Sequence, residues 1–119
     1  MNPKLLQQAQ CWRQATGKHW ERFTTPITMP ETGADVWLCP LTNEIAQSSL
    51  LTADEIQRAQ NFLPENKAHE FTAARVWLRT LLAAYVAETK PQSIRLGIAE
   101  NGKPYLMDFP AVQFNLSHS

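Results

Sequence analysis

Residues 51–91 read LTADEIQRAQNFLPENKAHEFTAARVWLRTLLAAYVAETKP, and this stretch decides the fold because it predicts two consecutive helices. Thr52 is followed three residues later by Glu55, which is the capping-box pattern that marks a helix start. The first helix is therefore expected from about Ala53 to Leu63. Three apolar side chains form one stripe along it, namely Ile56, Ala59 and Leu63.

A proline separates this helix from a longer one. Pro64 disfavours a helical conformation of the residue before it, so the first helix is expected to end there. The second helix is predicted from about Glu65 to Glu88, ahead of Pro91. Its apolar side chains recur at helical spacing and line one face, namely Phe71, Ala74, Leu78, Leu81, Leu82 and Tyr85.

Strands are expected on both sides of the two helices. The first is the short apolar run from about Asp35 to Leu41, and the pattern after Pro91 changes to a period of two. The Asn101-Gly102 pair is a strong turn signal. The later strands are predicted at Ile94 to Ile98, Tyr105 to Met107 and Val112 to Leu116. This order indicates an α+β fold, in which two helices pack on one face of an antiparallel sheet.

The first 33 residues differ from the rest of the chain. They are polar with scattered tryptophans, and the segment from Pro3 to about Lys18 has the spacing of an amphipathic helix. We expect residues 1–33 to form an extension that is partly helical or mobile. Residues 34–119 are then the structured unit.

Composition narrows the functional classes. The chain has 119 residues, 44% of them apolar, and its 11 basic and 11 acidic side chains balance. No overall charge attracts nucleic acid or an anionic membrane, although a local cluster could still hold a small anion. No long apolar run opens the chain, and Cys11 and Cys39 match no metal-binding spacing. These features predict a cytoplasmic protein with free thiols, and with neither nucleic acid nor a membrane as partner.

Polar side chains gather where the last predicted strand ends. If Val112, Phe114 and Leu116 face the core, then Gln113, Asn115 and Ser117 share the opposite face, and His118 follows. One interpretation is a solvated strand that leads into a loop. The other is a polar rim for an anionic ligand, in which His118 donates to a phosphate or carboxylate.

The turn at residues 101–104 is a second candidate. Gly102 permits a tight turn, which presents Lys103 before Pro104 fixes the backbone. This segment is either a hairpin with a solvated lysine or a turn that directs an ammonium group at phosphate. In the second case Pro104 would offer a flat apolar surface to a nucleotide base.

Arginines on the two helices are a third candidate. Arg75 and Arg79 lie four residues apart and share a helix face, while Arg58 lies on the preceding helix. Unpaired guanidinium groups hold phosphates in a bidentate manner, whereas pairing with Asp54, Glu55 or Glu70 would make them ordinary ion pairs. Both alternatives stay open for Arg58, and we expect Arg75 and Arg79 to be structural.

Three motifs in this order resemble a known family. They are QRAQNFLPENKAHEFTAARVWLRTLLAAYV at 57–86, NGKPYL at 101–106 and FNLSHS at 114–119. Together they resemble the N-terminal half of the 4′-phosphopantetheinyl transferases of the large two-lobed, surfactin-synthetase-activating type. The resemblance covers about residues 35–119. It implies one lobe of a pseudo-two-fold α+β fold.

The resemblance also implies an activity and a set of binding residues. Family members transfer phosphopantetheine from coenzyme A to a serine of an acyl or peptidyl carrier protein, releasing 3′,5′-adenosine bisphosphate. By resemblance, Lys103 contacts the nucleotide phosphates, Pro104 lies at the adenine, Ser117 and His118 hold coenzyme phosphates, and Arg58 holds the 3′-phosphate. The expected coenzyme-binding residues are Arg58, Gly102, Lys103, Pro104, Asn115, Ser117 and His118. No catalytic residue and no metal ligand is assigned.

The sequence also departs from the family. The Gly-x-Asp-x-Glu-type motif and the Trp-x-x-Lys-Glu-Ala-type helix, which supply magnesium ligands in the family, are not found in it. We therefore expect an N-terminal lobe that is inactive or weakly active alone, with Mg²⁺ bound only when a C-terminal lobe is present. An apolar face meant for that lobe is expected to cause self-association. The alternatives are a non-catalytic module that binds coenzyme A or assembles with a partner, and an α+β fragment without a ligand.

Overall fold

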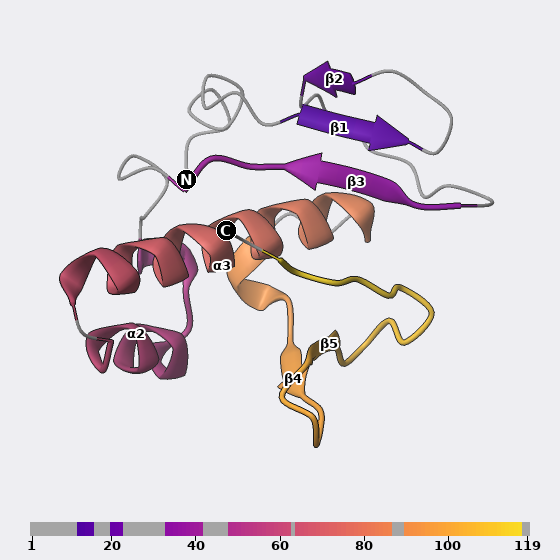
Figure 1. The fold of residues 1–119 in the computed structure, drawn as a ribbon. Coiled ribbons are helices and arrows are strands. Elements are labelled where there is room, and N and C mark those ends of the chain that lie inside the picture. The colour runs from indigo at the N-terminus through magenta and orange to yellow at the C-terminus, as the bar shows by residue number, and fades with distance from the viewer. Residues whose placement is uncertain are drawn as a thin grey trace.

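The fold is a small α+β arrangement around one long helix (Figure 1). The computed structural model describes residues 12–15, 20–22, 33–41, 48–62, 64–86 and 90–117. Figure 1 shows a three-stranded sheet on one side of the long helix, and a shorter helix and a β-hairpin on the other. No helix within these ranges combines the length and the apolar character that a membrane crossing needs.

The first sheet has the strand order β2-β1-β3 and is antiparallel throughout. Its strands are β1 at Trp12–Ala15, β2 at Trp20–Arg22 and β3 at Asp35–Leu38. The strand predicted from Asp35 is therefore confirmed but ends three residues early. The helix predicted from Pro3 to Lys18 is wrong at β1, because these four residues pair along their whole length with β3. The other residues of that predicted helix lie outside the described ranges.

Both predicted helices are present. Helix α2 spans Ala53–Gln60 and α3 spans Glu65–Tyr85. The capping box of α2 is confirmed, since the Thr52 backbone N–H donates to Glu55 Oε1 at 3.0 Å and the Glu55 N–H donates to Thr52 Oγ1 at 3.4 Å. Each helix ends three residues before its predicted end, and short 3₁₀ turns flank the pair at Ser48–Leu50 and Pro91–Ser93.

Helix α3 is packed on both flanks. One cluster joins Ala73, Val76 and Trp77 of this helix to Leu50 and Leu51. A second cluster is formed by Leu78, Leu82, Ala83, Ile94 and Leu106. Of the predicted apolar stripe, Leu78 and Leu82 are buried, whereas the other four side chains are only half-buried. The buried surface is therefore wider than one stripe, because segments that precede the helix and segments that follow it both pack against it.

The second sheet is a two-stranded hairpin, in which β4 at Leu96–Ile98 pairs with β5 at Pro104–Leu106. Gly102 adopts φ +84° in the connecting turn, a conformation that favours glycine, so the predicted turn is confirmed. The single antiparallel sheet that we predicted is wrong, because β4 and β5 form a sheet separate from β2-β1-β3.

The predicted strand at residues 112–116 is also wrong, since it forms no β-ladder in the described chain. The predicted alternation of buried and exposed side chains is seen for only part of this segment. Val112 and Phe114 pack against the second cluster, whereas Leu116 is exposed. The segment therefore has the side-chain pattern of a strand without a neighbouring strand to pair with.

Candidate phosphate-binding site

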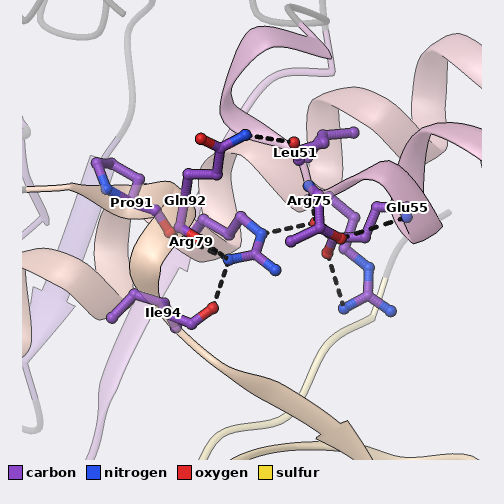
Figure 2. Close-up of polar contacts among 8 residues, drawn as sticks. Leu51, Glu55, Arg75, Arg79, Pro91, Gln92 and Ile94 are labelled. Carbon is purple, nitrogen blue, oxygen red and sulfur yellow. Dashed lines mark hydrogen bonds and ion pairs between the residues drawn. The ribbon is translucent and has the colours of Figure 1, made fainter.

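A buried arginine organises the region where α2, α3 and the following turn meet (Figure 2). Arg79 Nε donates to Glu55 Oε1 at 2.7 Å, and its Nη1 donates to the carbonyl oxygens of Pro91, Gln92 and Ile94 at 3.1, 3.3 and 2.6 Å. Only 3% of the Arg79 side chain is exposed. Its Nε and Nη1 donors are thus bound by the protein, which fits the structural role that we expected for this residue.

An open cavity of about 340 Å³ lies beside this buried arginine. Four of its lining residues are arginines and two are acidic, so cationic groups outnumber anionic groups around it. Its walls come from α2, α3, the turn after α3 and strand β4. The lining residues are Thr52, Asp54, Glu55, Arg58, Phe71, Arg75, Arg79, Gln92, Ile94, Arg95, Leu96, Gly97 and Ile98. A positive cavity with apolar walls suits a phosphorylated ligand.

Among the cavity arginines, Arg58 has the fewest polar contacts with the described part of the protein. Its guanidinium carbon lies 5.2 Å from the centre of the Phe71 ring, and it forms no ion pair with a carboxylate of the described residues. Arg75 lies 5.4 Å from the same ring, with Nη1 3.9 Å from Glu55 Oε2. Burial and the neighbouring Arg58 and Arg79 lower the pKa of Arg75 despite Glu55. Of the two alternatives for Arg58, this arrangement favours a group available for phosphate.

Arg95 reaches the cavity from the base of the hairpin. Its Nε donates to Asp108 Oδ2 at 2.9 Å, and its Nη2 donates to Asp108 Oδ1. Asp108 does not line the cavity. The pairing raises the pKa of Arg95 and lowers the pKa of Asp108, so both groups stay charged at neutral pH.

The turn residues that we predicted for the coenzyme lie elsewhere on the hairpin. Lys103 is exposed, and its backbone N–H donates to Asn101 Oδ1 at 3.0 Å. Pro104 is half-buried opposite Ile98 in the ladder. Neither Gly102, Lys103 nor Pro104 lines the cavity. The hairpin projects away from α3 in Figure 1, so its turn is a separate surface of the molecule.

The residues that we predicted at the end of the chain are not brought into the cavity either. Asn115 and Ser117 are exposed in the segment that follows the hairpin, and neither lines the cavity. His118 lies outside the described residues. Of the six predicted binding residues that the structure describes, Arg58 alone lines the cavity, and the shared site remains a prediction.

Comparison with known proteins agrees with the motifs. A 4′-phosphopantetheinyl transferase, HetI of Nostoc sp. (strain PCC 7120 / SAG 25.82 / UTEX 2576), is 32% identical over 100 residues, covering 78% of this chain and 42% of the relative. A 4′-phosphopantetheinyl transferase of Bacillus subtilis is 32% identical over 69 residues, covering 58% of this chain and 30% of the relative. The similarity supports the 4′-phosphopantetheinyl transferase superfamily.

The matches cover only part of each relative. A third relative, from Synechocystis sp. (strain ATCC 27184 / PCC 6803 / Kazusa), is 30% identical over 88 residues, which is 71% of this chain and 35% of the relative. The chain thus spans less than half the length of the transferases that it resembles. No family model and no solved structure matches it.

The described part of this transferase-like chain does not fit the magnesium ion expected for the superfamily. It contains no group of three or more histidine, cysteine, aspartate or glutamate side chains close enough to hold a metal. Of the two carboxylates at the cavity, Glu55 is already bound by Arg79. Four arginines around the same space would also repel a cation. The cavity is therefore better suited to an anion than to a metal cation.

Two cavity residues escaped sequence analysis. Phe71 was assigned to the apolar face of the longer helix, and Arg95 fell within the predicted strand from Ile94 to Ile98 without a role of its own. Phe71 instead lies under Arg58 and Arg75 and also stacks against Phe62, with ring centres 5.2 Å apart. The arginine-phenylalanine spacing of Arg75 and Phe71, four residues apart on one helix, was an available signal. Arg95 carried none, because its place depends on how the hairpin packs against α3.

Proposed function

We propose that this chain is the N-terminal lobe of a two-lobed 4′-phosphopantetheinyl transferase, which moves phosphopantetheine from coenzyme A to a serine of an acyl or peptidyl carrier protein. The similarity to the named transferases supports this, together with the cavity that gathers four arginines. In this proposal the second lobe is related to the first by a pseudo-two-fold axis and supplies the magnesium ligands.

The arginine cavity is the observation that carries the proposal. Coenzyme A is a polyanion that joins three phosphate groups to a flat base. Arg58 and Arg75 present guanidinium groups to the cavity, while Phe71, Leu96 and Ile98 supply apolar wall. We assign the 3′-phosphate to the Arg58 side of this cavity. Lys103, Pro104, Ser117 and His118, with Gly102 and Asn115 beside them, are proposed to contact the rest of the nucleotide once the second lobe is present.

The test is calorimetric titration of the chain with coenzyme A. Arg58→Gln should weaken binding about tenfold, the effect of losing one charge-assisted contact worth about 1.4 kcal/mol. Lys67→Gln is the matched control, because Lys67 pairs with Glu70 on α3 and does not line the cavity. If Arg58→Gln and Lys67→Gln bind equally well, Arg58 does not hold the coenzyme.

A carrier-protein assay separates the transferase from a module that only binds. The mass of an apo carrier protein rises when phosphopantetheine is attached to it. Attachment by the chain alone would contradict the expected inactivity of a single lobe. If coenzyme A binds but no transfer occurs even when a second lobe from a related transferase is supplied, the chain is a non-catalytic coenzyme-binding module.

A further inference from the structure

The cavity arginines differ in how firmly carboxylates and carbonyl oxygens hold them. Arg79 is buried and makes four polar contacts through Nε and Nη1, so it is the most firmly bound of the four. Arg75 has a long contact to Glu55, and Arg58 lies on a phenylalanine ring. Arg95 alone combines a two-point ion pair with an exposed side chain, 63% of which is accessible. Arg95 is therefore bound by a carboxylate, but at an exposed position where another anion can replace that carboxylate.

We propose that Asp108 tunes the affinity of the cavity for anions, by holding Arg95 in an ion pair that a phosphate group in the cavity displaces. Only the identity of the ligand rests on the proposed function. The exchange itself concerns any phosphate-bearing anion that enters the cavity.

Backbone geometry places the pair at the base of the hairpin. Arg95 immediately precedes β4, and Asp108 follows β5 by one intervening residue. The Met107 N–H donates to the Arg95 carbonyl oxygen at 3.0 Å, which fixes the two segments side by side. Arg95 lines the cavity, whereas Asp108 does not. Asp108 therefore binds Arg95 from outside the space that a ligand would occupy.

The energetics favour exchange. Ion pairs between exposed side chains contribute little, because water screens both charges and two side chains must be ordered. Asp108 is 43% exposed in its side chain, so releasing it leaves no buried charge. A phosphate dianion carries more charge than a carboxylate and accepts the same two-point contact from a guanidinium group. The cavity then gains a third arginine beside Arg58 and Arg75.

The inference predicts the sign of a double-mutant cycle, measured by titration with pyrophosphate and with coenzyme A at low salt. Asp108→Asn frees Arg95 and should tighten binding about two- to fivefold, the range expected for an exposed pair. Arg95→Gln should weaken binding, and Arg95→Gln with Asp108→Asn should bind no better than Arg95→Gln alone. Asp108→Ser, which also removes the carboxylate, should tighten binding in the same way.

Glu100→Gln is the matched control. Glu100 lies in the turn of the same hairpin and is exposed, so its removal changes the net charge equally without touching Arg95. The inference is overturned if Asp108→Asn weakens binding, if it tightens no more than Glu100→Gln, or if its gain persists without Arg95. Amide spectra of Leu96 and Leu106 verify that each variant keeps its hairpin.

The two ligands separate this inference from the proposed function. If pyrophosphate follows the cycle while coenzyme A does not bind, the exchange stands and the transferase proposal loses its support. If coenzyme A binds but the cycle shows no coupling between Arg95 and Asp108, the inference fails alone. If neither anion binds, the inference also fails.

Discussion

At the scale of single residues, Arg79 shows why a charge can be buried in so small a core. Its guanidinium group donates to a carboxylate and to three carbonyl oxygens where the chain leaves α3 and turns toward β4. Gln92 adds a contact from its Nε2 to the Leu51 carbonyl oxygen at 2.7 Å. These contacts hold the wall of the arginine cavity in place (Figure 2).

Arg79→Leu is therefore expected to be strongly destabilising. The substitution keeps apolar volume but leaves Glu55 without its main partner. It also removes the side-chain donor of three carbonyl oxygens, of which that of Pro91 keeps the Ile94 backbone N–H. Removing one partner of a buried ion pair costs about 3–5 kcal/mol. Urea unfolding followed by circular dichroism measures the loss. Lys67→Leu, which breaks an exposed pair on the same helix, should change the stability by less than about 1 kcal/mol; similar losses in the two variants would contradict the structural role of Arg79.

At the scale of elements, a polar cluster joins the first sheet to the C-terminal end of α3. Tyr85 donates its hydroxyl hydrogen to Asp35 Oδ2 and accepts from Trp37 Nε1 at 2.9 Å. Asp35 also pairs with Arg13 of β1 at 3.2 Å. Strands β1 and β3 are thus connected to the helix through one tyrosine.

Because of this cluster, we expect the free energy of unfolding to fall as the pH is raised into the alkaline range. Burial, and then the hydrogen bond to Asp35, raise the pKa of Tyr85 from 10.0 to about 12. Because the folded pKa is above the unfolded one, the contribution of Tyr85 is complete below pH 10.0 and is lost as the pH rises through about 12. The difference in unfolding free energy between the parent chain and Tyr85→Phe should shrink over this window. A difference that stays constant would show that Tyr85 ionises equally in both states.

The elements also show what a sequence can and cannot predict. The capping box at Thr52 and Glu55 and the turn at Gly102 depend on neighbours within a few residues, so they were predictable. The strand at Trp12–Ala15 depends on β3, about twenty residues away, and the missing strand at 112–116 depends on a pairing partner. For the same reason Arg58 could be named as a candidate from its helix, whereas the place of Arg95 at the cavity depends on the folded hairpin.

At the scale of the whole molecule, large apolar side chains remain exposed on the hairpin and the segment that follows it. They are Ile98, Tyr105, Met107, Phe109 and Leu116, between 43% and 61% accessible. Apolar surface of this kind marks interaction sites. In the proposed transferase it is the surface offered to the second lobe.

The chain alone is therefore expected to associate with itself. Sedimentation equilibrium should detect dimers or larger species whose dissociation constant rises about tenfold in Met107→Lys with Phe109→Lys, because two charges would be placed in the contact. Lys103→Met, which changes charge at the turn of the same hairpin, is the comparison. A monomer at all concentrations would contradict this expectation.

Helix α3 belongs to both apolar clusters at once, and each cluster gathers segments that are distant in the sequence. Among the described residues, neither cluster is complete without side chains of this helix. Opening either flank exposes the helix to water and weakens the other, so the two clusters should melt in one cooperative step. A protease that cuts within α3 would for this reason abolish the entire fold instead of releasing a stable subfragment.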